Sequence, residues 1–562
     1  MHIHPEELSA KNTFFLILAA WFVVNLLQAV FTGMSNDESY YALWGQHLAW
    51  GYFDHPPMVA VFNFLSALLF CGNLGVRFLT VLAQVGTLWL VWKMIDEKEA
   101  DNRKVCTFFI ISASLVMFAA LGFVTTPDAP LLFFTAFFLL SYKLFLKNEN
   151  ARNTLLLCLS MAGMVYSKYQ ACLVIGFIVL SNVRLLAKPK FWLAGIGALL
   201  LLSPHFYWQY SNHFPSFQYH LVDRSSQFQL KFFLEFIPNQ LAVFNPFTLG
   251  LVIYVLFKFR SKDVFERGLY VLIIGFLSFF WVMAYRGHVE PHWTVACSIP
   301  MIIILYNRSK EHEFVRKYIA RYVLGSVVLI LLIRVALVCP PLAGKVGFDE
   351  KKKFKAIESV AGKLPVVFTG SFQKPSMYTF FSGHPSTTIS SIYNRRTQFD
   401  VWQTEKAFEG KPVFVCAKVE GLSQSYQVGG QTFEGFFTDR FHSAMRLKVK
   451  AEMPAESVIH RGDTIHTSFS VHNPYPYSID FKDKTFPVSI CACFFTKKVK
   501  EICPITSKMD FSVMKPLETV SGEMSVIVPE LEEGEYTFSV TTNSVFGPAL
   551  ENDMYKMKIV KK

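Results

Sequence analysis

The sequence predicts an α-helical polytopic membrane protein with a polar, β-rich C-terminal part. Of its 562 residues 52% are hydrophobic and 16% aromatic, but only 17% are charged. Soluble domains carry about 25% charged residues, so the deficit indicates a membrane protein. Apolar runs recur through the first part of the chain, and alternating segments follow them. The formal net charge of +12 is typical of basic cytoplasmic loops, so no nucleic-acid partner is expected.

Eleven apolar segments are predicted to cross the membrane, for which a helix needs about 20 residues. A further apolar segment, 57–70, follows Pro56 and has only about 14 residues, which favours a helix lying in the interface. The region 153–186 also fits one long span in place of two. The eleven segments are 13–33, 74–92, 105–123, 129–146, 153–167, 169–186, 191–208, 232–257, 268–285, 292–306 and 320–340.

The Lys and Arg residues between these segments predict the orientation. With the N-terminus in the cytoplasm, the inner segments hold 20 Lys and Arg residues and the outer segments hold five. Basic residues concentrate in the cytoplasmic loops of membrane proteins. We therefore expect a multi-pass protein of the plasma membrane (the inner membrane of a bacterium) with its C-terminal domains outside the cytoplasm.

Three domains are expected from the change of composition along the chain. Residues 1–344 form the transmembrane domain, with a catalytic first outer loop at 34–57. Residues 345–440 mix short apolar runs with helical pieces, which indicates a small α/β domain. Residues 441–562 alternate in hydrophobicity between turn residues, as in a β-sandwich.

Four cysteines lie in the C-terminal part, at positions 416, 491, 493 and 503. An extracytoplasmic location permits a disulfide from Cys503 to Cys491 or Cys493. A zinc site is the weaker alternative, because one C-x-C pair with a distant Cys lacks the usual ligand spacing.

The chemistry is expected to centre on the outer loop from Ser35 to Met58, SNDESYYALWGQHLAWGYFDHPPM. It holds the carboxylates of Asp37, Glu38 and Asp54 but no Lys or Arg. Its aromatic side chains suit the boundary between lipid headgroups and acyl chains. A carboxylate held there beside a like charge has its pKa raised toward the range of a general base. Asp37 and Glu38 are the predicted catalytic residues, and the alternative is a solvated loop pair.

Asp54 and His55 precede two prolines that fix the chain where it enters the apolar segment 57–70. The two side chains are predicted to bind a phosphate or a divalent metal at the headgroup level, with Asp54 as the metal ligand. No other cofactor is expected. The alternative is a structural turn that caps the interfacial helix.

Later outer loops supply further charged and polar groups. Lys168 lies between two apolar segments, where it either extends to the interface or pairs with an anion such as a phosphate. Asp128 is placed to cap a helix N-terminus and can also orient the site. For the histidines, interfacial packing is the alternative to a role in binding. The remaining candidates are His213 and Arg224 in one loop and Arg286 and His288 in the next.

A sugar attached through phosphate to a long lipid matches this set of residues. Phosphate is a good leaving group, so cationic groups need only stabilise the charge that it keeps. One carboxylate then takes the proton from an acceptor hydroxyl on the opposite face of the sugar. Such a displacement inverts the anomeric centre.

At these residues the sequence resembles the protein O-mannosyltransferase superfamily, which includes the bacterial lipid A aminoarabinose transferases. N-D-E-S-Y-Y at 36–41 looks like the D-E motif of that superfamily. F-D-H-P-P, T-P-D-A-P, S-K-Y and S-P-H-F-Y-W-Q-Y-S-N-H-F-P-S-F are similar to further blocks of its bacterial members. The resemblance covers about residues 10–310.

The resemblance implies a C-type glycosyltransferase fold, a polyprenyl-phosphate-linked sugar as donor, and Asp37 as the base. Lys168 resembles the lysine at the outer end of a span in that superfamily. Tyr40 stands where the aminoarabinose transferases have an Arg, and Asp54-His55-Pro56 stands where they have Glu-Lys-Pro. Tyr40 and Tyr41 are expected to contact the acceptor or to shape the site.

The predicted function is therefore an inverting membrane glycosyltransferase, transferring a hexose or pentose from polyprenyl phosphate to an extracytoplasmic lipid, glycan or protein. Lys168, His55, and Arg224 or Arg286 would hold the donor phosphate. The expected partners are the donor, the acceptor and the lipid bilayer. A lipid or lipid-linked sugar transporter is one alternative, although transporters place ionisable groups near the bilayer midplane. A non-catalytic cell-envelope assembly protein is the other.

Overall fold

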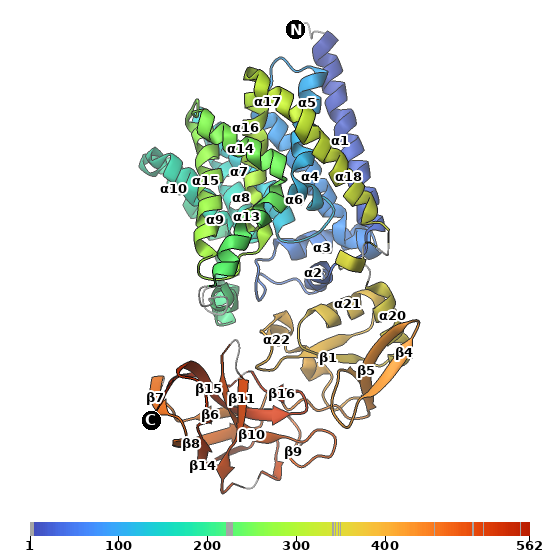
Figure 1. Cartoon of the computed structure of the whole chain (residues 1–562), viewed down its shortest axis with the longest axis vertical. Coiled ribbons are helices and arrows are strands. Elements are labelled where there is room, and N and C mark those ends of the chain that lie inside the picture. Colours follow the sequence, from blue (N-terminus) through green and yellow to red (C-terminus); the bar gives the residue numbers. More distant parts are fainter. Residues whose placement is uncertain are drawn as a thin grey trace. The chain divides into compact units, whose positions relative to one another are not determined.

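The computed structural model divides the chain into two compact units, Met1–Glu350 and Lys351–Lys562. The first is helical and the second is built on β-sheets (Figure 1). The structure describes residues 5–220, 229–339, 342, 344–346, 348, 350–454, 456–496, 500–509, 511–550 and 552–561. The candidate residue Arg224 lies outside the described residues.

The first unit is a bundle of helices of unequal length. They are joined or extended by the 3₁₀ segments η1 (Val183–Ala187), η3 (Pro291–Cys297) and η5 (Gly344–Val346) and by the π-helical turn η4 (Ile319–Val323). Its α-helices are α1 (Pro5–Phe31), α2 (Asn36–Gln46), α3 (Met58–Leu69), α4 (Gly72–Ile95), α5 (Asn102–Ser114), α6 (Val116–Ala120), α7 (Asp128–Lys147), α8 (Ala151–Ser167), α9 (Ala171–Ser181), α10 (Pro189–Leu201), α11 (Ser203–Ser211), α12 (Pro215–Gln218), α13 (Leu230–Phe244), α14 (Pro246–Lys258), α15 (Val264–Met283), α16 (Ser298–Glu311), α17 (Glu313–Tyr318) and α18 (Leu324–Ala336).

The prediction of a helical polytopic membrane protein is confirmed, but fewer spans than eleven meet the requirements of length and composition. Among the described residues, five helices are long and apolar enough to cross a membrane, or up to seven if each of two bent pairs is one span. The segment 57–70 forms the helix α3, and its position in the membrane interface stays a prediction. Four predicted segments correspond to helices that have fewer than 18 residues or are interrupted: 105–123, 153–167, 169–186 and 292–306.

Local chemistry explains the interruptions. The segment 105–123 breaks at Leu115, whose backbone is extended; the hydroxyl of Ser114 donates to the Ile111 carbonyl at 2.7 Å and so competes with the helical ladder. Helices α13 and α14 meet at 103°. Asn245 takes a positive φ of 67° at this joint, and Pro246 begins the next helix without a backbone N–H to donate.

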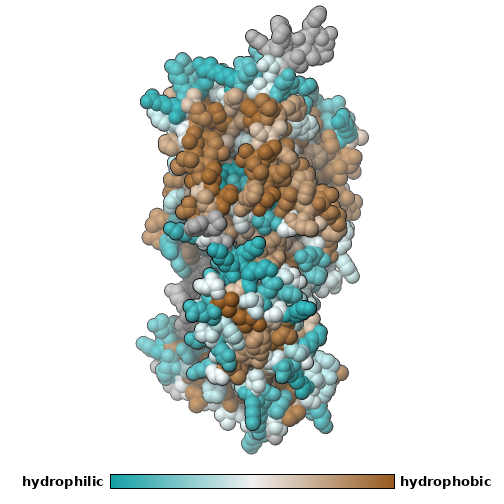
Figure 2. All heavy atoms as spheres, turned by 90° about the vertical axis from the view of Figure 1, so that its right-hand side faces the viewer, coloured by the Kyte–Doolittle hydropathy of each residue, from teal (hydrophilic) through white to brown (hydrophobic). Residues whose placement is uncertain are grey.

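The helix faces exposed at the side of this bundle are largely apolar. In the spans Ser9–Phe31 and Glu313–Ala336 only 28% of the residues in the most apolar window are buried. Figure 2 shows a broad hydrophobic band over this unit, on the side where α1 and α18 lie. Exposed apolar helix faces of this extent suit a lipid environment and not water.

A polar cluster lies inside this apolar bundle. Gln84 of α4 accepts hydrogen bonds from Trp21 Nε1 at 2.9 Å and from Asn25 Nδ2 at 2.5 Å. The Gln84 side chain also donates to the Phe118 carbonyl. The close approach is possible because residue 122 is glycine: a Cβ there would lie 1.6 Å from Gln84 Oε1 and 2.6 Å from Asn25 Nδ2.

Replacing Gly122 with Ala is therefore expected to destabilise the membrane unit by about 1–3 kcal/mol, the usual cost of overpacking a well-packed interior. Thermal unfolding in detergent measures the effect. Gly195→Ala is the matched control, because a Cβ at Gly195 of α10 meets nothing within 4 Å. Equal unfolding temperatures for the two variants would contradict the packing described at Gly122.

The second unit begins with a mixed α/β sheet of order β2-β1-β3-β5-β4. Strand β1 pairs in parallel with β2 and β3, whereas β5 pairs antiparallel with β3 and β4. Parallel pairing needs crossover connections, which the helices supply. The elements are α20 (Lys351–Ala361), β1 (Val366–Thr369), α21 (Gln373–Ser382), β2 (Ser386–Ile389), α22 (Gln398–Trp402), η6 (Thr404–Ala407), β3 (Val413–Cys416), β4 (Gln424–Val428) and β5 (Gln431–Thr438).

The remaining strands form further sheets, two of which share a core. One has the order β11-β10-β15-β17-β7 with β16 attached to β15, another is β12-β14-β8-β6, and β13 pairs with β9. Phe469 and Val471 of β8 pack in one buried cluster with Phe494 and Phe538 of the facing sheet. The strands are β6 (Lys448–Ala451), β7 (Glu456–His460), β8 (Thr464–His472), β9 (Ile479–Asp480), β10 (Ser489–Phe495), β11 (Lys500–Pro504), β12 (Thr506–Ser507), β13 (Val513–Met514), β14 (Thr519–Ile527), β15 (Gly534–Ser544), β16 (Gly547–Pro548) and β17 (Tyr555–Val560).

The prediction of a β-rich C-terminal part is thus confirmed, and its sheets are mixed. The division into an α/β domain and a β-sandwich at 440 and 441 stays a prediction. The suggested disulfide is absent: Cys491, Cys493 and Cys503 are all free. The register explains why. Cys503 lies opposite Ala492 in the β10–β11 ladder, so its side chain is on the other sheet face from those of Cys491 and Cys493.

Candidate active site

The predicted catalytic loop forms the short helix α2 and its N-terminal cap. Ser35 is the N-cap, its hydroxyl accepts from the Glu38 backbone N–H at 3.4 Å, and the Glu38 carboxylate accepts from the Ser35 backbone N–H at 3.3 Å. The letters S-N-D-E are thus a capping box, which fixes where the helix begins. Asp37 lies in the first turn, and its side chain is exposed.

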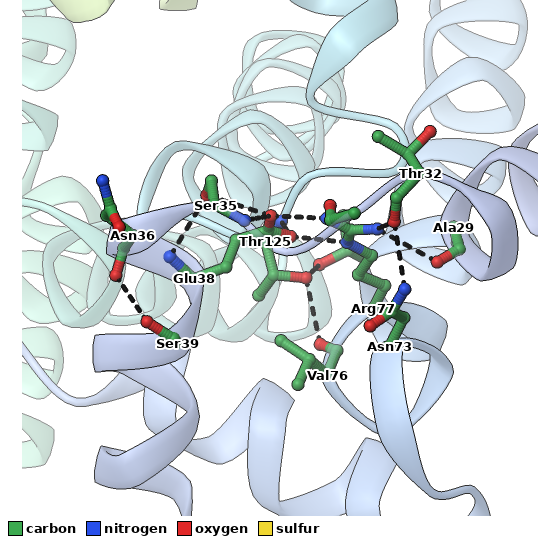
Figure 3. A network of polar contacts seen from close by, with 12 residues as sticks. Ala29, Thr32, Ser35, Asn36, Glu38, Ser39, Asn73, Val76, Arg77 and Thr125 are labelled. Atoms are coloured by element: carbon green, nitrogen blue, oxygen red, sulfur yellow. Dashed lines mark hydrogen bonds and ion pairs between the residues drawn. The ribbon is translucent and has the colours of Figure 1, made fainter. Parts of the chain in front are cut away.

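The neighbouring carboxylate, Glu38, is buried in an ion pair with Arg77 of α4 (Figure 3). Arg77 Nε lies 2.7 Å from Glu38 Oε1, and Nη2 lies 2.6 Å from Oε2, which is the bidentate geometry of a strong pair. Both side chains are 0% exposed. The Thr125 backbone N–H also donates to Glu38 Oε1, at 2.9 Å.

The rest of the Arg77 guanidinium holds the chain between α1 and α2. It donates to the carbonyls of Ala29 at 3.0 Å, Thr32 at 2.7 Å and Gly33 at 2.6 Å. Arg77 and Glu38 therefore tie α2 to α1, to α4 and to the segment that precedes α7. The sequence predicts Glu38 as a catalytic residue together with Asp37, but these contacts occupy the Glu38 carboxylate. Its effect is to position α2 and leave Asp37 exposed.

A second buried ion pair joins two further predicted residues. Lys168, at the end of α8, places its Nζ 2.8 Å from each carboxylate oxygen of Asp128. Both side chains are 2% exposed, and His292 Nε2 lies 3.6 Å from Asp128 Oδ2. Asp128 is the first residue of α7 but makes no capping hydrogen bond. Its expected role as a cap is therefore wrong, because its carboxylate binds Lys168.

Breaking this pair is expected to be costly. Asp128→Asn would leave the Lys168 ammonium buried without its carboxylate, which destabilises a protein by about 3 kcal/mol. The free energy of unfolding in detergent measures this loss. The double variant Asp128→Asn/Lys168→Met removes both charges and should recover a large part of it. A single variant as stable as the wild type would show that the pair does not form.

Tyr41 of α2 is a buried tyrosine near several carboxylates. Burial, together with the negative charges of Asp37, Asp54 and Asp128, raises the pKa of the Tyr41 hydroxyl well above its ordinary value. Three carboxylates from separate segments thus act on one hydroxyl. Asp37 and Tyr41 lie one turn apart on α2, and the Tyr41 ring lies 5.9 Å from that of His55, the residue after Asp54.

Aromatic rings of the loop line the same region. The rings of Trp44 and Tyr52 stack 4.2 Å apart, and the Tyr41 ring lies 4.9 Å from Trp44. The His55 ring lies 5.9 Å from Tyr41 and 6.2 Å from His220. His55, a predicted phosphate ligand, is therefore near Tyr41.

A chain of hydrogen bonds fixes the far end of the loop. His205 Nδ1 lies 2.7 Å from the Trp50 carbonyl oxygen, and its Nε2 lies 3.1 Å from the Tyr169 hydroxyl. Gln209 donates to that hydroxyl at 3.0 Å and to the Ser216 hydroxyl at 2.7 Å. These contacts connect the loop to α11 and to the residue that follows Lys168.

Three further predicted site residues lie at the surface. His213 is exposed and takes a positive φ of 59°. Arg286 is exposed, and His288 Nε2 lies 3.5 Å from a Glu290 carboxylate oxygen. No group of three or more His, Cys, Asp or Glu side chains within the described ranges could hold a metal ion. A metal ion at Asp54 stays a prediction without structural support.

Sequence reasoning missed three contributors. It counts Arg77 only as one basic residue on the outer side, and it gives no role to Tyr169 or Gln209. The available signal was that Arg77 lies in an apolar segment that follows the carboxylate-rich loop, because a charge in an apolar segment needs a partner. Which carboxylate it would meet depends on how α4 packs against α2.

The comparisons agree with the predicted resemblance to the protein O-mannosyltransferase superfamily. Residues 54–208 match the family model described as dolichyl-phosphate-mannose-protein mannosyltransferase. No curated protein matches the chain in sequence. The matched segment lies within the membrane unit, from the loop after α2 to α11.

Solved structures of an ArnT protein share the fold. The crystal structure of ArnT from Cupriavidus metallidurans in the apo state is 14% identical, covers 76% of this chain and 98% of its own, and has a TM-score of 0.58. The same protein bound to undecaprenyl phosphate is 14% identical, covers 75% of this chain and 97% of its own, and has a TM-score of 0.55.

Proposed function

We propose that this protein is an inverting glycosyltransferase that moves a sugar from a polyprenyl-phosphate-linked donor to an extracytoplasmic acceptor. The observation that supports it best is the arrangement around α2. An exposed carboxylate, Asp37, is carried by a helix that the buried Glu38–Arg77 pair holds in place. Its charge reaches the same Tyr41 hydroxyl as that of Asp128, the partner of Lys168.

In the proposed reaction Asp37 is the general base. It takes the proton of the acceptor hydroxyl as that oxygen attacks the anomeric carbon, and the polyprenyl phosphate leaves from the opposite face. The sugar is transferred with inversion. The phosphate keeps its negative charge and needs cationic stabilisation, not protonation.

Lys168 is the proposed cation nearest the reacting phosphate. Its ammonium has three donors, of which two point to the Asp128 oxygens at 2.8 Å. The third can bind a phosphate oxygen. His55 and either Arg224 or Arg286 are proposed as further donor-phosphate ligands, and Tyr40 and Tyr41 as acceptor contacts or walls of the site.

Glu38 and Arg77 are positioning residues in this proposal. The ArnT structure with undecaprenyl phosphate supports a polyprenyl-phosphate donor, because its fold resembles that of this chain. The excess of Lys and Arg in alternate loops supports a cytoplasmic N-terminus. The full set of eleven crossings and the location in the plasma membrane belong to the same proposal.

A transfer assay with purified protein in detergent tests the proposal. Polyprenyl-phosphate-linked sugars are supplied one at a time with an envelope extract as acceptor source, and release of free polyprenyl phosphate is measured. Acceptor-dependent release with at least one sugar is expected. No release from any donor in the set, with protein shown to be folded, would overturn the assignment.

A further inference from the structure

The membrane unit contains a cavity away from the loop that carries Asp37. It has a volume of about 370 Å³ and lies between α1, α5 and α18, with Ala119 of α6 at its edge. Apart from Asn25 and Arg334 its lining side chains are aliphatic, aromatic or, at Cys106, a thiol. Along α1 it extends from Asn25 to Ile17, which is about 12 Å of helix.

The cavity opens toward the surrounding lipid. Val24 of α1 is 44% exposed and Leu331 of α18 is 47% exposed, and both line it. The face on which these two helices lie is largely hydrophobic, with a small hydrophilic patch inside the band (Figure 2). A molecule that enters this cavity therefore comes from the bilayer.

One end of the cavity carries a buried guanidinium. Arg334 is only 8% exposed, and its Nη2 donates to Asn25 Oδ1 at 2.6 Å. The guanidinium also lies 4.8 Å from the centre of the Phe123 ring. Its Nε is buried and makes no hydrogen bond to any described residue.

The charge of Arg334 is not balanced by its surroundings. The cavity lining contains no Asp or Glu, and the polar groups of the adjoining cluster, Asn25 and Gln84, are neutral amides. None of the described carboxylates forms an ion pair with this arginine. A buried guanidinium without a counter-charge is strongly unfavourable, and a phosphate would supply both the charge and the missing acceptors.

We propose that this cavity is a binding site for an anionic phospholipid of the surrounding bilayer, with the lipid phosphodiester on Arg334 and one acyl chain along α1 and α18. The apolar lining fits the acyl chain, and the guanidinium at one end fits the headgroup phosphate. A bound lipid would hold α18 against α1, the helix that leads into α2.

Native mass spectrometry of the purified full-length protein tests this site. Phosphatidylglycerol, phosphatidylethanolamine and a polyprenyl monophosphate are titrated in separate arms. Two variants act on different parts of the site. Arg334→Gln removes the charge, and Ala20→Phe fills the cavity but leaves the charge of Arg334 in place. The matched controls are Arg321→Gln, an exposed arginine on the same span, and Ala19→Phe, an exposed alanine beside Ala20 that does not line the cavity.

Phosphatidylglycerol is expected to bind the wild type and both controls saturably. Its affinity for Arg334→Gln and for Ala20→Phe should be at least tenfold lower. If Arg334→Gln fails to fold, Ala20→Phe still tests the cavity. Equal affinity for phosphatidylethanolamine, or affinities unchanged in both site variants, would overturn the proposal. Preferential, Arg334-dependent binding of the polyprenyl monophosphate would also overturn it, because the occupant would then be the lipid carrier and not a bilayer phospholipid.

Discussion

Asp37→Asn is expected to reduce sugar transfer by the purified protein at least a hundredfold, while the protein folds and inserts normally. The amide keeps the shape of the side chain but cannot accept the acceptor proton, and loss of general-base catalysis alone costs about 10²–10⁴ in rate. Asp37 is exposed in the first turn of α2, so the substitution changes a side chain at the surface of the helix. The measurement is release of polyprenyl phosphate at saturating donor.

Asp96→Asn is the control for this experiment. Asp96 is the residue after the C-terminal end of α4 and is also exposed, so the same chemical change is made outside the proposed site. It should leave the rate within twofold of the wild type. Substantial transfer by Asp37→Asn would remove Asp37 as the base.

Arg77→Met is expected to cause the largest loss of stability, about 5 kcal/mol, because breaking a buried ion pair leaves the other charge without compensation. Glu38 would stay buried at 0% exposure, and the carbonyls of Ala29, Thr32 and Gly33 would lose their donor. Transfer should be lost with the fold of the α1–α2 connection. Chemical unfolding in detergent gives the free energy.

Two further variants separate the ion pair from general damage. Glu38→Gln/Arg77→Met removes both charges and should be more stable than Arg77→Met alone. Arg321→Met, at an exposed arginine, should change stability by less than about 0.5 kcal/mol. If Arg77→Met unfolded at the same denaturant concentration as the wild type, the buried pair would not exist.

The sequence was sufficient for the features that depend on local pattern. Apolar runs predicted the helical membrane unit, and alternation predicted the strands of the C-terminal part, because burial of one face imposes a period on the residues. The S-N-D-E letters also have the pattern of a capping box, a signal for the start of α2 that the prediction did not use. Asp37 and Lys168 could be singled out because a charge next to an apolar span is energetically costly unless it pairs with another group or belongs to a functional site.

Features that depend on packing between distant segments could not be predicted. Glu38 meets Arg77, 39 residues away, and Lys168 meets Asp128, 40 residues away. Nothing in the local sequence distinguishes these partners from other charges on the same side. The register that places Cys503 and Cys493 on opposite sheet faces is likewise a property of the β10–β11 ladder.

The most direct test of the central claim is the profile of lipid-linked sugars in cells that lack the protein. One polyprenyl-phosphate-linked sugar should accumulate, and the wild-type gene, but not Asp37→Asn, should return it to its normal level. An unchanged profile, or full restoration by Asp37→Asn, would contradict the claim that Asp37 drives sugar transfer from a polyprenyl phosphate.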